Sequence, residues 1–189
     1  ACVYESSGRV AATDFSFDAV GTPASSAARE PYSALLLLDQ SRRVADYDPY
    51  DLRTLAAKHF IRRARSSTQA DLVAVAGFAG QGGDASAPPL LPQLPLWAPP
   101  HTATVFSADR FAQEAAVDTL RPLVGGTAPV FDALGAALTL TAAQAPATGR
   151  RAIVALLGGG DDSGLSESQR QAALASLRQQ QADTGIQVV

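Results

Sequence analysis

Three short runs of apolar residues, separated by segments with helical spacing, constrain the fold of this chain more than any other feature. The runs are Tyr32 to Leu38, Asp71 to Phe78 and Arg151 to Leu157. Each has the length of a buried strand and is apolar on both faces, as expected when helices cover both sides of a parallel sheet. The alternation predicts a doubly wound α/β fold with a mostly parallel sheet. Ligands bind such sheets beyond the carboxyl ends of the strands, so the loops after Leu38 and Leu157 should share one rim.

Start and stop signals place helices between these runs. Asp48 and Ser107 are expected to cap two of them, and Ser166 with Gln169 forms a capping box that opens a third. Gly185 is expected to end the last helix, before a final strand over Ile186 to Val189. The apolar residues that helical spacing should bring to one face of their helices are Leu52, Leu55, Ala56 and Phe60, then Phe111, Ala115 and Leu120, then Phe131, Leu134 and Leu138.

Composition excludes several classes of function. The net charge is −3 and no basic stripe is present, so the chain has no electrostatic footprint for nucleic acid. The apolar runs are far shorter than the ~20 residues of a transmembrane segment. Ala1 before Cys2 fits a bacterial lipoprotein with a lipid tether at Cys2. The plainer interpretation is an incidental cysteine, and both stay open.

Four features in fixed order then resemble a von Willebrand factor A (VWA) domain. They are a strand ending in Asp39-x-Ser41, a helix opened by Asp48-Pro49, a Gly-Gly-Thr at 125–127 before Phe-Asp-Ala-Leu at 131–134, and a strand ending in the glycine-rich acidic loop 158–162. The resemblance covers about Tyr32 to Val189. It implies a three-layer α/β domain over 31–189, with 1–30 as an N-terminal extension that could add one edge strand.

The resemblance also implies a metal site, and here the sequence departs from the family. VWA domains bind Mg²⁺ through an Asp-x-Ser-x-Ser loop, a threonine from a second loop and an aspartate from a third. Asp39, Ser41 and Thr127 match three of these ligands. Arg43 stands at the second serine and Gly159 at the third-loop aspartate. We therefore expect an impaired or absent metal site, with either no cofactor or weakly bound Mg²⁺ or Mn²⁺.

Two compensations are conceivable for the lost ligands. Arg42 or Arg43 could replace the metal by forming an ion pair with Asp39, because an unpaired buried carboxylate is costly. Alternatively, Asp161 or Asp162 could swing in as a substitute ligand.

Each site residue also has a purely structural interpretation. Asp39 and Ser41 could cap the turn after their strand, and Thr127 could be a helix N-cap. Asp161 and Asp162 could place negative charge near a helix start.

The resemblance yields two expectations outside the metal site. Thr102 to Phe106 should form one antiparallel edge strand. The proline-rich connection Ala79 to Pro100 is long for such a turn, so we expect it to pack across the rim or the edge of the sheet and to offer Leu94, Leu96 and Trp97 to a partner. Trp97 could instead be a plug over the core. Family members also continue with another helix and strand, so the domain is expected to be incomplete at its C-terminal end.

The predicted function is a non-catalytic protein-binding or scaffolding domain in the bacterial cell envelope, outside the cytoplasm, with another protein as partner. The alternative is a Rossmann-type nucleotide-binding enzyme that uses the Gly158–Gly160 loop. Against it, Ser163 falls where a G-x-G-x-x-G motif needs its third glycine.

Overall fold

The four strands form one parallel sheet. The computed structural model of the protein describes residues 30–64, 71–79, 106–120 and 126–189. Its strands are β1 (Tyr32–Asp39), β2 (Leu72–Phe78), β3 (Arg150–Leu156) and β4 (Gln187–Val188), in the spatial order β2-β1-β3-β4. Every pairing between these strands is parallel. The prediction of three parallel strands and a final short strand is confirmed, but only β1 and β2 are buried along nearly their whole length, whereas in β3 only Ile153 is buried.

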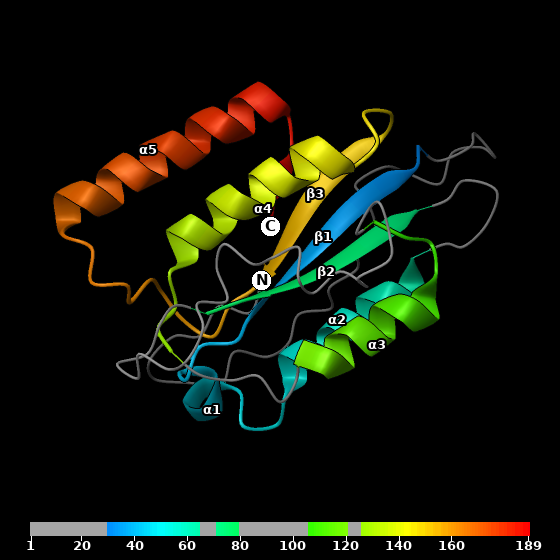
Figure 1. Cartoon of the computed structure of the whole chain (residues 1–189), viewed down its shortest axis with the longest axis horizontal. Coiled ribbons are helices and arrows are strands. Elements are labelled where there is room, and N and C mark those ends of the chain that lie inside the picture. The colour runs from blue at the N-terminus through cyan, green and yellow to red at the C-terminus, as the bar shows by residue number, and fades with distance from the viewer. Residues whose placement is uncertain (1–29, 65–70, 80–105, 121–125) are drawn as a thin grey trace, which may run out of the picture.

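Helices cover both faces of the sheet, which makes the fold doubly wound (Figure 1). The helices are α1 (Val44–Tyr47), α2 (Leu52–Arg63), α3 (Arg110–Leu120), α4 (Val130–Gln144) and α5 (Glu167–Thr184). In Figure 1, α2 and α3 lie below the sheet, α4 and α5 lie above it, and α1 lies at the end where β1 finishes. Helix α4 precedes β3 and helix α5 follows it, and both lie on the same face of the sheet. Helix α2 connects β1 to β2 on the other face.

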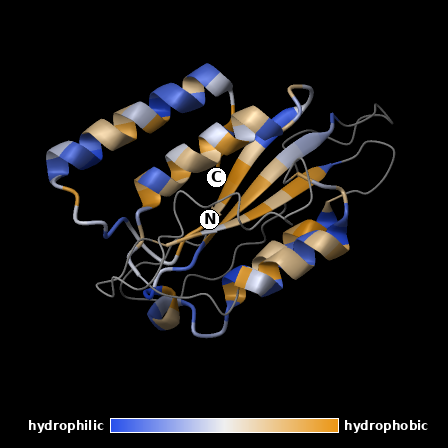
Figure 2. Cartoon of the chain, viewed as in Figure 1, coloured by the Kyte–Doolittle hydropathy of each residue, from blue (hydrophilic) through white to orange (hydrophobic). Residues whose placement is uncertain are grey.

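Two hydrophobic cores lie back to back because β1 is buried on both faces. Leu35 and Leu37 pack with residues of α4, whereas Leu36 and Leu38 pack with residues of α2 and α3. All four leucines are 0 % exposed. Figure 2 shows the same division, with strands that are hydrophobic along most of their length and an outer helix α5 that is largely hydrophilic. No helix among the described residues has both the length and the apolar character needed to cross a membrane.

Helix α2 turns a different face to the core from the one expected. Leu52 and Leu55 are more than half exposed, and the buried positions are Arg53, Thr54, Ala57 and Ile61. The reason lies at the start of the helix. The carboxylate of Asp48 accepts hydrogen bonds from the backbone N–H groups of Leu52 (2.6 Å) and Arg53 (3.0 Å). This capping and the hydrogen bonds of the Arg53 side chain fix the rotation of α2.

Helix α3 also differs from expectation. Asp109, not Ser107, caps it, because its Oδ1 accepts from the backbone N–H groups of Phe111 (3.0 Å) and Ala112 (3.2 Å). Phe111 is 88 % exposed, so it does not share the buried face with Leu120.

The signals at the two ends of α5 are confirmed. Ser166 and Gln169 form the expected capping box, and Gly185 ends the helix in the left-handed region with φ of 64°. No residue of α5 is buried, and the helix lies against α4.

Several expectations fall outside the described residues. These are the lipid tether at Cys2, the N-terminal edge strand, and the partner-binding residues Leu94, Leu96 and Trp97. Most of the expected antiparallel edge strand, Thr102 to Phe106, also lies there. Next to it, Ser107 forms an isolated antiparallel bridge with Val73 through two backbone hydrogen bonds of 3.0 Å.

Candidate functional site

Asp39 joins two loops at the carboxyl end of the sheet. It ends β1 and is 0 % exposed. Its Oδ1 accepts a hydrogen bond from Ser41 N (2.8 Å), and its Oδ2 accepts one from Gly158 N (2.9 Å). An added Cβ at 158 would lie 3.3 Å from Asp39 Oδ2, a tight contact that the glycine avoids. The prediction that the loops after β1 and β3 share one rim is confirmed.

Residues 126–129 form the second loop of the VWA pattern, and they meet the first loop, after β1, and the third loop, after β3, at this rim. Arg42 N donates to Gly126 O (3.1 Å), which ties the first loop to the second. Asp162 Oδ1 accepts from Ala128 N, and Asp162 N donates to Ala128 O (3.2 Å), which ties the third loop to the second. The three loops that the VWA resemblance picks out therefore contact one another pairwise through hydrogen bonds.

The arginine that supports the first loop is Arg53, which sequence reasoning missed. Its side chain, 6 % exposed, donates from Nε to the backbone oxygen of Asp39 (3.0 Å) and from Nη2 to Gln40 Oε1 (3.1 Å). Its Nη1 contacts the carboxylates of Asp48 (3.1 Å) and Asp51 (2.9 Å). The two carboxylates neutralise a buried cation, and that cation holds the backbone at the end of β1.

The ion pair expected between Asp39 and Arg42 or Arg43 does not form. Both carboxylate oxygens of Asp39 point into the loops, where backbone N–H groups satisfy them. Arg43 extends outward instead. Its Nε lies 3.5 Å from Asp162 Oδ2, and its Nη1 donates to Gly160 O (3.3 Å). Arg42 is exposed to solvent.

The two acidic residues of the third loop do not take the place of the lost ligand. Asp161 Oδ2 accepts from Phe131 N (3.2 Å), in the first turn of α4, and its Oδ1 accepts from Ser163 N (3.0 Å). Asp162 is engaged with Ala128 and Arg43. The structural interpretation, negative charge near a helix start, describes Asp161, but the helix is α4 rather than the following α5.

Thr127 is half-buried in the second loop. The interpretation as a helix N-cap is wrong, because Pro129 holds that position at α4 without any side-chain hydrogen bond. Its place beside the first loop is the one that the VWA resemblance implies.

The side chains at the positions that the VWA resemblance assigns to a metal form an incomplete set of oxygen ligands. One observation favours a ligand here: Ser41 Oγ and Gln40 Nε2 are buried without a hydrogen-bond partner. However, Mg²⁺ needs an octahedron of oxygens around it, and the side chains at 43 and 159 supply none. Gly159 offers no side chain, and a guanidinium lies over it. Within the described ranges, no group of three or more His, Cys, Asp or Glu side chains could hold a metal ion.

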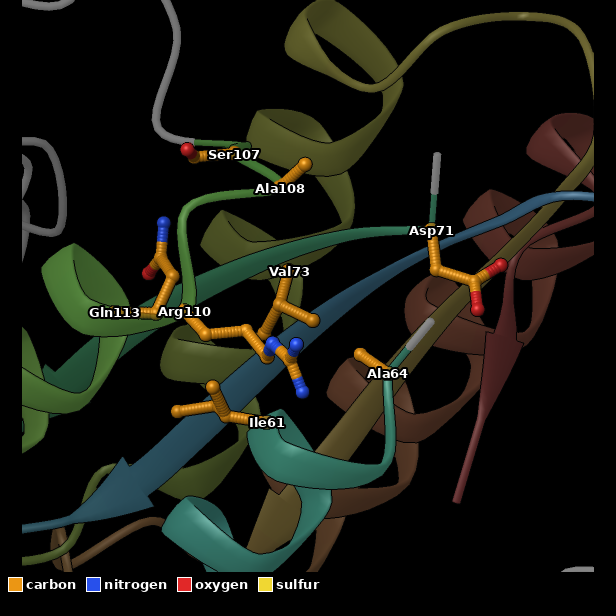
Figure 3. A pocket seen from close by; sticks show the side chains of 8 residues that line it. All are labelled: Ile61, Ala64, Asp71, Val73, Ser107, Ala108, Arg110 and Gln113. Carbon is orange, nitrogen blue, oxygen red and sulfur yellow. The ribbon is translucent and has the colours of Figure 1, made fainter. Parts of the chain in front are cut away.

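A recess at the opposite end of the sheet gives no second site. It lies between α2, the start of β2 and the start of α3, and Figure 3 shows the eight side chains that line it, among them Asp71, Arg110 and Gln113. It has no room for a molecule the size of water.

Several exposed apolar side chains come soon after the first loop of the rim in the chain. The described residues include seven large apolar side chains that are exposed, and four of them come from the nine residues that run from the last residue of α1 into the start of α2. They are Tyr47 (65 %), Tyr50 (80 %), Leu52 (56 %) and Leu55 (58 %). We call these four residues the 47–55 surface.

No family model and no curated protein matches this chain. Among solved structures, the chain is similar to the vWF domain of the type V pili tip protein Mfa5 from Porphyromonas gingivalis, with a TM-score of 0.48 and 12 % sequence identity. The match covers 75 % of this chain and 44 % of that chain, so the chain spans less than half of the length of that protein.

Proposed function

We propose that this chain is a non-catalytic protein-binding domain of VWA type that engages its partner without a metal ion. The observation that carries the proposal is the 47–55 surface. Exposed apolar side chains that follow a structured loop closely in the chain are candidates for a protein interaction site, and tyrosine and arginine are enriched among interface residues that dominate affinity. Arg42, exposed on the first loop, adds a charged group five residues before Tyr47 in the chain.

The rim is also stiff enough to present such a surface. Three loops are joined by backbone hydrogen bonds, and Arg53 fixes the junction of β1 with the segment before α2. A partner that binds here would meet a preorganised surface, which lowers the entropy lost on binding. An extracytoplasmic place in the cell envelope is part of the proposal and rests on the resemblance to VWA domains.

The geometry gives the nucleotide-binding alternative little support. A phosphate would need free N–H groups in a glycine loop that leads directly into a helix. Here Gly158 N already donates to Asp39, and α5 begins only at Glu167, seven residues after Gly160. Asp161 and Asp162 would add negative charge beside the phosphate. A thermal shift assay with ATP and NAD tests this directly, and we expect no change in melting temperature.

The main experiment is a capture assay in EDTA. The biotinylated chain is exposed to envelope extracts of its source cells, and retained proteins are quantified by mass spectrometry. We expect a protein that the wild type retains without divalent metal and that Tyr47→Ser/Tyr50→Ser loses. Phe111→Ser is the matched control, because Phe111 is 88 % exposed on α3, away from the 47–55 surface.

Purified partner and chain are then mixed to measure Kd for each variant. Retention that requires Mg²⁺ would contradict metal-independent binding. Equal affinity of the tyrosine variant and the Phe111 control would remove the 47–55 surface from the proposal.

A further inference from the structure

Two departures from the VWA pattern, Arg43 and Gly159, lie against each other in space. A Cβ built on Gly159 would have Arg43 Nη1 as its nearest neighbour, at 3.5 Å. The guanidinium therefore borders the space into which a side chain at 159 would project, at an ordinary contact distance from its Cβ. These residues are 116 positions apart in the chain, and nothing in the sequence links them.

The backbone does not explain the glycine at 159. The described glycines with positive φ are Gly126, Gly149, Gly164 and Gly185, so Gly159 has a conformation that other residues also adopt. Gly160 has open space around it, and Gly158 is confined by Asp39. At Gly159 the only neighbour of an added Cβ within 4 Å is the guanidinium of Arg43, from the first loop.

We propose that Arg43 is a resident cation that replaces the divalent ion of VWA domains, and that Gly159 is its steric complement. This inference rests on the proposed function, because it gives the reason that the rim works without metal. It differs from the ion pair expected from the sequence, because the partner of the cation is the third loop and not Asp39.

The contacts of Arg43 support this role. In the VWA pattern the metal joins ligands from the first and third loops. Arg43 joins the same two loops, through its 3.5 Å approach to Asp162 and its hydrogen bond to Gly160 O at 3.3 Å. Its positive charge also repels a divalent cation from Asp39 and Ser41. The ion pair is partly solvated, with side chains 37 % and 26 % exposed, so it positions the loops more than it stabilises the fold.

If the two positions alone close the site, restoring both should reopen it. The remaining groups are in place, because Asp39 and Ser41 lie on the first loop and Thr127 lies on the second, with Ser41 Oγ buried and without a partner. Arg43→Ser returns the missing hydroxyl and removes the positive charge. Gly159→Asp returns the carboxylate.

The test is calorimetric titration of the EDTA-treated full chain with Mn²⁺. We expect no saturable binding by the wild type or by Gly159→Asp, and a Kd below about 1 mM for Arg43→Ser/Gly159→Asp. The matched control is Arg43→Ser/Gly159→Asn, which has the same shape without the carboxylate and should bind at least about tenfold more weakly. Far-UV circular dichroism checks that each variant is folded.

A second measurement needs no metal and no double variant. With Arg43 kept, Gly159→Asp should place a carboxylate against the guanidinium. Its melting temperature should exceed that of Gly159→Asn at low salt, and the difference should shrink in 1 M NaCl, where the Debye length is about 3 Å. Equal melting temperatures at low salt would show that Arg43 does not occupy this place.

Two further results would overturn the inference. Saturable Mn²⁺ binding by the wild type would mean that Arg43 does not exclude the metal. A folded double variant that fails to bind would mean that other residues close the site. Neither result bears on capture by the 47–55 surface, which the tyrosine variants test separately.

Discussion

Replacing Arg53 with methionine should destabilise the protein strongly. Methionine keeps most of the apolar length of the side chain but removes the charge and all donors. The Asp39 carbonyl oxygen and Gln40 Oε1 would lose the hydrogen bonds at 3.0 and 3.1 Å, in residues that are both 0 % exposed. A buried acceptor left without a partner costs about 1–3 kcal/mol.

The two carboxylates that face Arg53 add to this cost. The side chains of Asp48 and Asp51 are 13 % and 25 % exposed, so water compensates only part of the lost attraction. Breaking a buried ion pair by removing one partner typically costs about 3–5 kcal/mol, and we expect a loss within this range. That is a large share of the roughly 5–15 kcal/mol that holds a typical domain folded.

Urea unfolding followed by circular dichroism measures the effect. For slopes of about 1–3 kcal/mol per molar urea, Arg53→Met should lower the midpoint by more than about 1 M. Arg63→Met is the matched control, because Arg63 is an exposed residue of the same helix, and surface changes usually stay within about 0.5 kcal/mol. A loss below about 1 kcal/mol for Arg53→Met would refute the view that this cation organises the first loop.

Three smaller predictions concern the rim and the helices. Gly158→Ala should lower the free energy of unfolding in urea by about 1–3 kcal/mol, because its methyl group would lie 3.3 Å from a buried carboxylate oxygen. Gly160→Ala should have no effect, because nothing lies within 4 Å of its added methyl group. Equal effects of the two substitutions would contradict the close approach at Gly158. Ser166→Ala should cost about 1 kcal/mol by removing the capping box of α5, and an unchanged midpoint would show that the cap is dispensable. The side-chain hydrogen bond from Arg62 and its charge lower the pKa of Glu114. The pair should therefore stabilise the fold at pH values above the unfolded pKa of glutamate, and this effect should be lost as the pH falls through the lower folded pKa. The melting temperatures of Glu114→Gln and the wild type should differ at pH 7 and converge in acid.

The sheet was predictable because its strands leave few alternatives. A run such as Leu35 to Leu38 is too apolar to lie at a surface and too short to span a membrane, so a strand covered on both faces is the natural solution. The shared rim follows from parallel pairing, since strands that run the same way end at the same side. Local chemistry also sufficed for Ser166 and Gly185, because helix caps depend on neighbouring residues alone.

The interior of the site was not predictable in the same way. Arginine is usually exposed, and the burial of Arg53 depends on four acceptors from three places in the chain. The pattern on α2 was ambiguous as well, because Ala57 and Ile61 have helical spacing just as Leu52 and Leu55 do. Arg43 was expected to reach Asp39 since both belong to one loop. Its true neighbours come from the third loop, and only the three-dimensional arrangement places them there.

The pairing of β1 also has a consequence for how the chain reaches its native state. β1 is the central strand, and its partner β3 follows about 120 residues later, as the pairing of Tyr32 with Arg150 shows. A ribosome adds about 5–20 residues per second, so several seconds pass between the emergence of the two strands. During that interval one edge of a four-leucine strand has no β3 to pair with. Nascent chains of this protein should therefore depend on holding chaperones until β3 is synthesised, and their aggregation should fall sharply once it is.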